Sequence, residues 1–195
     1  MKTMLRYPLT LAAFAAGVGF NVLAGPSPGQ FDFGKFTPPD GGGEFVEIQI
    51  QSNLLSLASQ TVEQQAPEVA KLLRNVELIR VNVIGLTDAN RADTVNRVRQ
   101  IRHDLEARGW DKNVTVQDKN GEDVGIYTKT RGGEALAGLT ITVIEPKGEV
   151  VLVNIVGDIR PEQVAVLGDK LDLKPLKEIG AALKDAAPKD AAPKK

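Results

Sequence analysis

The stretch most suggestive of chemistry is VVLVNIVGDIRPEQVAVLGDKL at 150–171, where an apolar run leads through Gly157 into a helix that begins at Pro161. A strand, a glycine turn and a helix are also the layout of phosphate-binding loops. Such a loop needs G-x-x-x-x-G-K-[ST], so that backbone N–H groups, a lysine and a hydroxyl converge on a phosphate. These residues are missing at the required offsets after Gly157, and Asp158 would repel a phosphate. We therefore predict a structural turn at Gly157 and a helix start at Pro161.

The single histidine, His103, lies in an arginine-rich segment that is predicted to be helical, outside its apolar stripe. One histidine without cysteine does not make a typical zinc site, and the sequence has no HExxH spacing. No G-x-S-x-G motif supplies a serine nucleophile for it. We expect a solvated helical histidine.

The stretch DKNGED at 118–123 places acidic or amide side chains at alternate positions, as a calcium loop does. An EF-hand also requires glycine at position six and glutamate at position twelve, where this chain has Asp123 and Lys129. A hairpin turn at Asn120–Gly121 explains the composition without a metal. The sequence therefore predicts no catalytic residue, no metal site and no cofactor.

The first 24 residues predict a signal peptide for export. Lys2 and Arg6 precede the apolar run YPLTLAAFAAGVGF, and Val22 and Ala24 are the small residues before a cleavage site. The run is shorter than the ~20 residues that span a bilayer, so we expect no stable membrane span after cleavage. The chain has no cysteine, which excludes a lipid-modified cysteine anchor. We expect a soluble periplasmic or secreted protein.

Composition divides the mature chain into three parts. Residues 25–43 are rich in Gly and Pro and are predicted to be a flexible leader. Residues 174–195 are rich in Lys, Ala and Pro and are predicted to be a disordered tail. A single globular domain at 44–173 lies between them. The formal net charge of −1 gives no bulk attraction to nucleic acid.

Hydrophobic periodicity within the domain predicts the order β-α-β-α-β-β-β-β-α. The first helical segment should break just before Pro67, and a long helix should cover 90–108. We predict an α+β fold, a two-layer mixed sheet of about six strands with the helices on one face and the other face open. The last strand is nearly all apolar and should be central. The predicted strands are 45–51, 77–85, 113–117, 123–131, 139–145 and 149–156.

Alternation along the strands assigns polar side chains to the open face. In FVEIQIQ at 45–51, the Val and Ile residues would meet the helices while the Glu and Gln residues face outward. A sheet face that mixes a tyrosine, arginines and amides could bind a peptide, a glycan or a second copy of the chain; a wet, unoccupied face is the alternative. The predicted partner-binding residues are Glu47, Arg80, Tyr127, Lys129 and Arg131.

Two stretches resemble the bacterial domain-of-unknown-function family 4252: FVEIQIQSNLLSLASQTVEQQAPEVAKLLRNVELIRVNVI and VNIVGDIRPEQVAVLGDKLDL. The similarity covers about residues 45–173. It implies an exported bacterial protein without established catalytic residues, and gene neighbours that encode extracytoplasmic-function sigma factors point to envelope stress regulation. Members are often lipoproteins, whereas this chain lacks the lipobox cysteine. Arg160 also stands where the family pattern has an acidic residue.

These features together predict a non-catalytic binding or interaction module of the cell envelope, with an envelope protein, peptide or glycan as partner. One alternative is a carboxylate-dependent hydrolase, which needs two acids in a cleft with separated pKa values. The other is a structural homo-oligomer joined through an edge strand or the open face.

Overall fold

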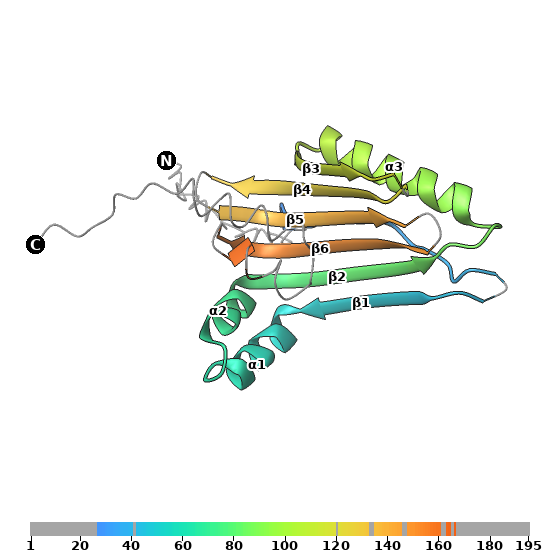
Figure 1. Ribbon diagram of the computed structural model, residues 1–195. Helices are drawn as coiled ribbons and strands as arrows, with labels where there is room; N and C mark the ends of the chain where they lie inside the picture. The colour runs from blue at the N-terminus through green and yellow to red at the C-terminus, as the bar shows by residue number, and fades with distance from the viewer. Residues whose placement is uncertain are drawn as a thin grey trace, which may run out of the picture.

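The computed structural model describes most of the chain between residues 27 and 166 (Figure 1). The predicted signal peptide at 1–24, the predicted tail at 174–195 and most of the predicted last helix lie outside the described residues. The described residues are 27–40, 42–119, 121–132, 135–145, 148–160, 163–164 and 166.

Six strands form one sheet in the order β1-β2-β6-β5-β4-β3, which confirms the predicted α+β fold and strand number. Within the described part of the chain, none of the helices has both the length and the apolar composition needed to cross a membrane. The strands are β1 (Phe45–Gln51), β2 (Val76–Gly85), β3 (Asp111–Gln117), β4 (Asp123–Arg131), β5 (Ala135–Ile144) and β6 (Glu149–Ile159), and the helices are α1 (Ser52–Val62), α2 (Pro67–Asn75) and α3 (Arg91–Ala107).

The predicted mixed sheet is wrong, because every neighbouring pair of strands is antiparallel. The reason lies in the connection from β1 to β2. The chain leaves β1 through α1, reverses before Pro67, and returns through α2 to the end of the sheet that it left (Figure 1). β2 therefore begins beside the end of β1 and runs back along it, which a single crossover helix would not allow.

Strand β6 lies between β2 and β5, in the central position that its apolar composition predicted. It continues to Ile159, so the turn predicted at Gly157 is wrong. Gly157 instead pairs with Val76 at a register shift, where a Cβ would lie 2.8 Å from the Val76 Cα. The glycine is needed for a close approach of two strands rather than for a turn.

Helices cover both faces of the sheet, so the predicted open face is wrong. On one side, which we call the α1–α2 face, Leu55 and Leu72 join a core cluster with Ile155. On the other side, the α3 face, Ile101 and Leu105 of α3 join a second cluster with sheet residues. The second cluster exists because β6 and its neighbours carry apolar residues on this face too. Its sheet members are Ile84, Tyr127, Ile144, Val150 and Leu152.

The predicted flexible leader also packs on the α3 face, in contrast to the expectation from composition. Phe31 and Phe33 are each 2% exposed and share the second cluster with Trp110. The buried Asn154 side chain forms hydrogen bonds with the leader backbone at two positions. Its Oδ1 accepts the Phe31 N–H at 3.0 Å, and its Nδ2 donates to the Gly29 carbonyl at 3.1 Å. Residues 27–36 are thus an integral part of the fold.

The leader crosses β5 with backbone against backbone at Gly29 and Gly138. A Cβ on Gly138 would lie 2.6 Å from the Gly29 Cα and 2.8 Å from the Trp110 ring. No larger residue fits at this crossing without displacing the leader.

Candidate functional site

The predicted partner-binding residues share the α3 face, as strand alternation indicated. The sheet register places Gln49, Arg80, Asn154, Thr140 and Tyr127 in one row from β1 to β4. This row is covered by the leader and by α3, because Thr140 and Asn154 are fully buried and Tyr127 is 1% exposed.

Arg80 holds the leader against the sheet next to the β1 edge. Its Nη1 lies 3.1 Å from the Asp32 Oδ1, and its Nη2 donates to the Gln49 Oε1 at 3.1 Å. Asp32 is 76% exposed, so the ion pair itself adds little stability. The geometry gives Arg80 a role in positioning the leader.

Arg131 and Glu77 lie near the start of the described leader. The Arg131 Nη2 is 3.6 Å from the Glu77 Oε1, and the Ser27 hydroxyl donates to the Glu77 Oε2 at 2.6 Å. About half of both charged side chains is exposed, so Arg131 stays at the surface.

Tyr127 and Lys129 serve the packing of α3. Burial raises the pKa of Tyr127 above its usual value of 10.0, which keeps the phenol neutral. The Lys129 Nζ donates to the carbonyl oxygens of Arg108 and Gly109, both at 2.8 Å. A lysine at this end of a helix satisfies free carbonyls and complements the helix dipole. Neither side chain is placed to meet a partner directly.

A partly buried arginine of α3, Arg102, fixes the helix on the sheet. The Arg102 Nη1 lies 2.8 Å from the Asp123 Oδ1, and its Nε donates to the Thr142 hydroxyl at 2.8 Å. The arginine and aspartate side chains are only 13% and 17% exposed. An arginine on the helix and a polar residue on each of two strands were visible in the sequence, but their proximity depends on the tertiary fold.

Glu47 is the member of the predicted set that lies on an edge strand. It is exposed on β1, and no ion pair or hydrogen bond involves its side chain among the described residues. It is therefore available for contact with another molecule.

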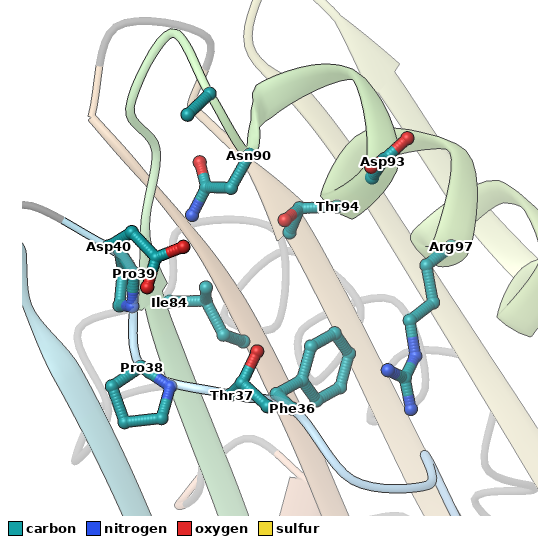
Figure 2. A pocket seen from close by; sticks show the side chains of 11 residues that line it. Phe36, Thr37, Pro38, Pro39, Asp40, Ile84, Asn90, Asp93, Thr94 and Arg97 are labelled. Carbon is teal, nitrogen blue, oxygen red and sulfur yellow. The ribbon is translucent and has the colours of Figure 1, made fainter.

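A surface pocket of about 500 Å³ lies between the leader and the first turns of α3 (Figure 2). Asp40, Thr37 and Phe36 come from the leader, and Asn90, Asp93, Thr94 and Arg97 from the start of α3 and the residue before it. The Arg97 guanidinium is engaged, since it donates to the Phe33 carbonyl at 3.0 Å and lies 4.0 Å from the Phe36 ring centre. The pocket thus combines two carboxylates with hydroxyl and amide groups. Its other lining residues are Pro38, Pro39, Ile84 and Ala89.

The described residues contain no group of three or more His, Cys, Asp or Glu side chains that could hold a metal ion. His103 is exposed on α3. Gly121 has a φ of 86°, the left-handed conformation that glycine favours in the hairpin between β3 and β4.

A second surface, which the sequence reasoning assigned to helix packing, is apolar and only partly covered. α1 and α2 lie at one end of the α1–α2 face, where β1 ends and β2 begins (Figure 1). Ile48 is 41% exposed, and the neighbouring apolar side chains are only partly buried. We call this surface the apolar strip. It consists of Val46, Ile48, Val81, Val83 and Val151.

The apolar strip spans three adjacent strands in register. Val46 pairs with Val83, and Val83 pairs with Val151; one step along, Ile48 pairs with Val81. Strand alternation identified these side chains correctly as one face. It could not show that α1 and α2 leave them only partly buried.

Comparison with known proteins identifies a family. A family model for a domain of unknown function (DUF4252) matches residues 40–167, a range that includes every strand and helix that the structure describes. Searches of curated proteins and of solved structures gave no match. The family model covers well over half of the chain and agrees with the resemblance in the two sequence stretches. The chain belongs to the family of the domain of unknown function DUF4252.

Proposed function

We propose that the protein is an exported, non-catalytic interaction module of the bacterial cell envelope that binds a partner protein through the apolar strip. The observation that carries the proposal is the partial exposure of five β-branched side chains on adjacent strands. Contiguous exposed apolar surface on a soluble domain is typical of a protein interaction site. The polar face that was first predicted to bind a partner is occupied by the chain's own leader and α3.

The chemistry of the strip favours a partner that presents apolar side chains rather than a glycan. Valine and isoleucine offer no hydrogen bond to sugar hydroxyls, whereas they gain about 25 cal/mol for each Å² of apolar area buried. The β-branched side chains of the strip have restricted χ1 angles, so little side-chain entropy is lost on binding.

The envelope location rests on the predicted signal peptide and on the family resemblance. A connection to envelope stress regulation has its support in the sigma-factor neighbourhood that the resemblance implies. In that setting, the strip would bind another envelope protein and act without chemistry of its own.

The pocket beside α3 supports a second candidate, the carboxylate-dependent hydrolase. Asp40 and Asp93 line opposite walls, one from the leader and one from the helix. Replacing Asp40 by Asn would abolish hydrolysis if this candidate were correct, and would leave partner binding through the strip unchanged.

Site-specific photocross-linking in cells tests the proposal. A photoreactive residue at Val83, in the middle of the strip, should give a discrete adduct with another envelope protein. The matched control is the same residue at Val116, which is 40% exposed on β3 and lies outside the strip. The adduct should appear from position 83 only, and a second substitution, Val81→Asp, should remove it. Equal adducts from both positions, or no adduct from position 83, would refute the proposed surface.

A further inference from the structure

The β1 edge of the sheet lacks the features that usually block edge-to-edge pairing. Its sequence, FVEIQIQ, contains no proline and no lysine, and its only charge is Glu47. The opposite edge, β3, begins with Asp111 and Lys112 and has a register irregularity between Lys112 and Val114. Charges and bulges of this kind are the means by which proteins protect edge strands. Only one of the two edges is protected in this way.

The ladder between β1 and β2 shows which backbone groups of β1 face outward. The Gly85 N–H donates to the Glu44 carbonyl at 2.7 Å, so these two residues form a hydrogen-bonded pair. In an antiparallel ladder such pairs alternate along the strand. The backbone groups of Val46, Ile48 and Ile50 therefore point to β2. Those of Phe45, Glu47 and Gln49 point away from the sheet, as does the Gln51 N–H, whereas the Gln51 carbonyl accepts the first hydrogen bond of α1.

We propose that β1 pairs antiparallel with β1 of a second copy of this chain, joining two six-stranded sheets about a twofold axis at Ile48. A strand that pairs with itself in this way forms a closed, self-complementary dimer interface. In each copy, outward N–H groups of four residues and outward C=O groups of three residues are free to pair, which would supply about six hydrogen bonds across the interface.

Side-chain chemistry selects the register. With the axis at Ile48, the two Ile48 side chains meet, and Val46 faces Ile50 of the other copy. Glu47 faces Gln49 of the other copy, which places a carboxylate acceptor beside an amide donor. An axis at Glu47 would place two like charges opposite each other. A shift by one residue would turn apolar side chains to opposite faces. The chosen register also joins the two apolar strips into one surface.

This inference does not rest on the proposed partner binding, because a dimer could form without an envelope partner. Variants separate the two. Val81→Asp alters the strip within β2 and leaves the outward groups of β1 in place. Glu47→Pro removes an outward N–H of β1 without removing a hydrogen bond to β2, and it leaves Val81 and Val83 unchanged.

Disulfide cross-linking tests the proposed register directly, because the chain has no cysteine of its own. Residues opposite each other in a non-hydrogen-bonded pair have Cα atoms about 4.5 Å apart, within the range that a disulfide spans. Ile48→Cys in the mature chain, residues 25–195, should therefore form a covalent dimer under mild oxidation. The matched control is Val116→Cys, since the two side chains are 41% and 40% exposed on opposite edges. We expect cross-linking at position 48 to be at least about tenfold faster.

Sedimentation equilibrium of the cysteine-free protein provides the second measurement. The unmodified chain and Glu47→Gln should dimerise, and Glu47→Pro should raise the dimer dissociation constant at least about tenfold, because the proline ring replaces a donor in the new ladder. Should Glu47→Pro fail to fold, the cross-linking rates still decide. The proposal is overturned if the unmodified chain stays monomeric at every concentration, or if positions 48 and 116 cross-link at the same rate.

Discussion

Truncation of Phe31 tests whether the leader is part of the folded core. Phe31 is 2% exposed; its ring centre is 5.9 Å from that of Phe33 and 6.3 Å from that of Trp110, to which it is perpendicular. Replacing a fully buried phenylalanine by alanine costs about 3–5 kcal/mol of unfolding free energy. If the whole leader detaches from the sheet in the variant, the loss of unfolding free energy is limited to the free energy with which the leader docks. We therefore expect Phe31→Ala to lower the unfolding free energy by about 2–4 kcal/mol.

Urea unfolding monitored by tryptophan fluorescence measures this loss, because Trp110 is the only tryptophan and touches Phe31. The emission of folded Phe31→Ala should also shift to longer wavelength as water reaches the indole. Phe36→Ala is the control: Phe36 is only half-buried, and we expect a loss of about 1 kcal/mol. A loss below about 1 kcal/mol for Phe31→Ala, with unchanged emission, would refute the packing of the leader and restore the flexible leader that composition suggested.

Three further predictions concern the α3 face. Arg102→Met should lower the unfolding free energy by about 3 kcal/mol, because it leaves the partly buried Asp123 carboxylate without its arginine partner. Replacement of the exposed Arg99 by Met should change the unfolding free energy by less than about 0.5 kcal/mol, and chemical denaturation of both variants measures the difference. Gly138→Ala should release the leader, since the alanine Cβ would lie 2.6 Å from the Gly29 Cα, and faster amide exchange at residues 27–36 would report the release. Tyr127 has a raised pKa in the folded state, so above about pH 10 the unfolded chain loses a proton that the folded chain keeps, and stability falls. Tyr127→Phe has no phenol to ionise at this position, so its stability lacks this loss at high pH. The difference in unfolding free energy between the two proteins should be constant below about pH 9 and should shift in favour of the variant above about pH 10.

Local sequence signals predicted the elements of the fold closely. The strand at 45–51 has the predicted bounds, the helical segment breaks before Pro67, and the hairpin predicted at Asn120–Gly121 joins β3 to β4. These features depend on neighbouring residues, whose backbone preferences do not need the rest of the chain.

Local sequence signals could not predict which elements cover each face of the sheet. Alternation shows which side chains share a face. Both faces of β6 are apolar, which predicts a central position for this strand. It was equally a sign that a second layer covers the α3 face. The pattern Phe31-Asp32-Phe33 in the leader is also period two, and its partner Asn154 lies 123 residues away. Contacts over such a separation are not visible in a local pattern.

The predicted binding residues depend on the same tertiary contacts. Alternation placed Arg80 and Tyr127 on one face correctly, yet the leader and α3 occupy that face. The apolar strip was missed because valines facing a helix layer and valines beyond its end have the same sequence pattern.

The proposed function depends most on whether the apolar strip is accessible to solvent in the isolated protein and covered in the cell. Thiol modification of Val83→Cys, with Thr140→Cys as a fully buried control, measures this directly. We predict rapid modification at position 83 in the purified protein, slow modification at position 140, and protection of position 83 in intact cells. Slow modification at position 83 in the purified protein, or equally rapid modification in cells, would contradict a partner-binding strip.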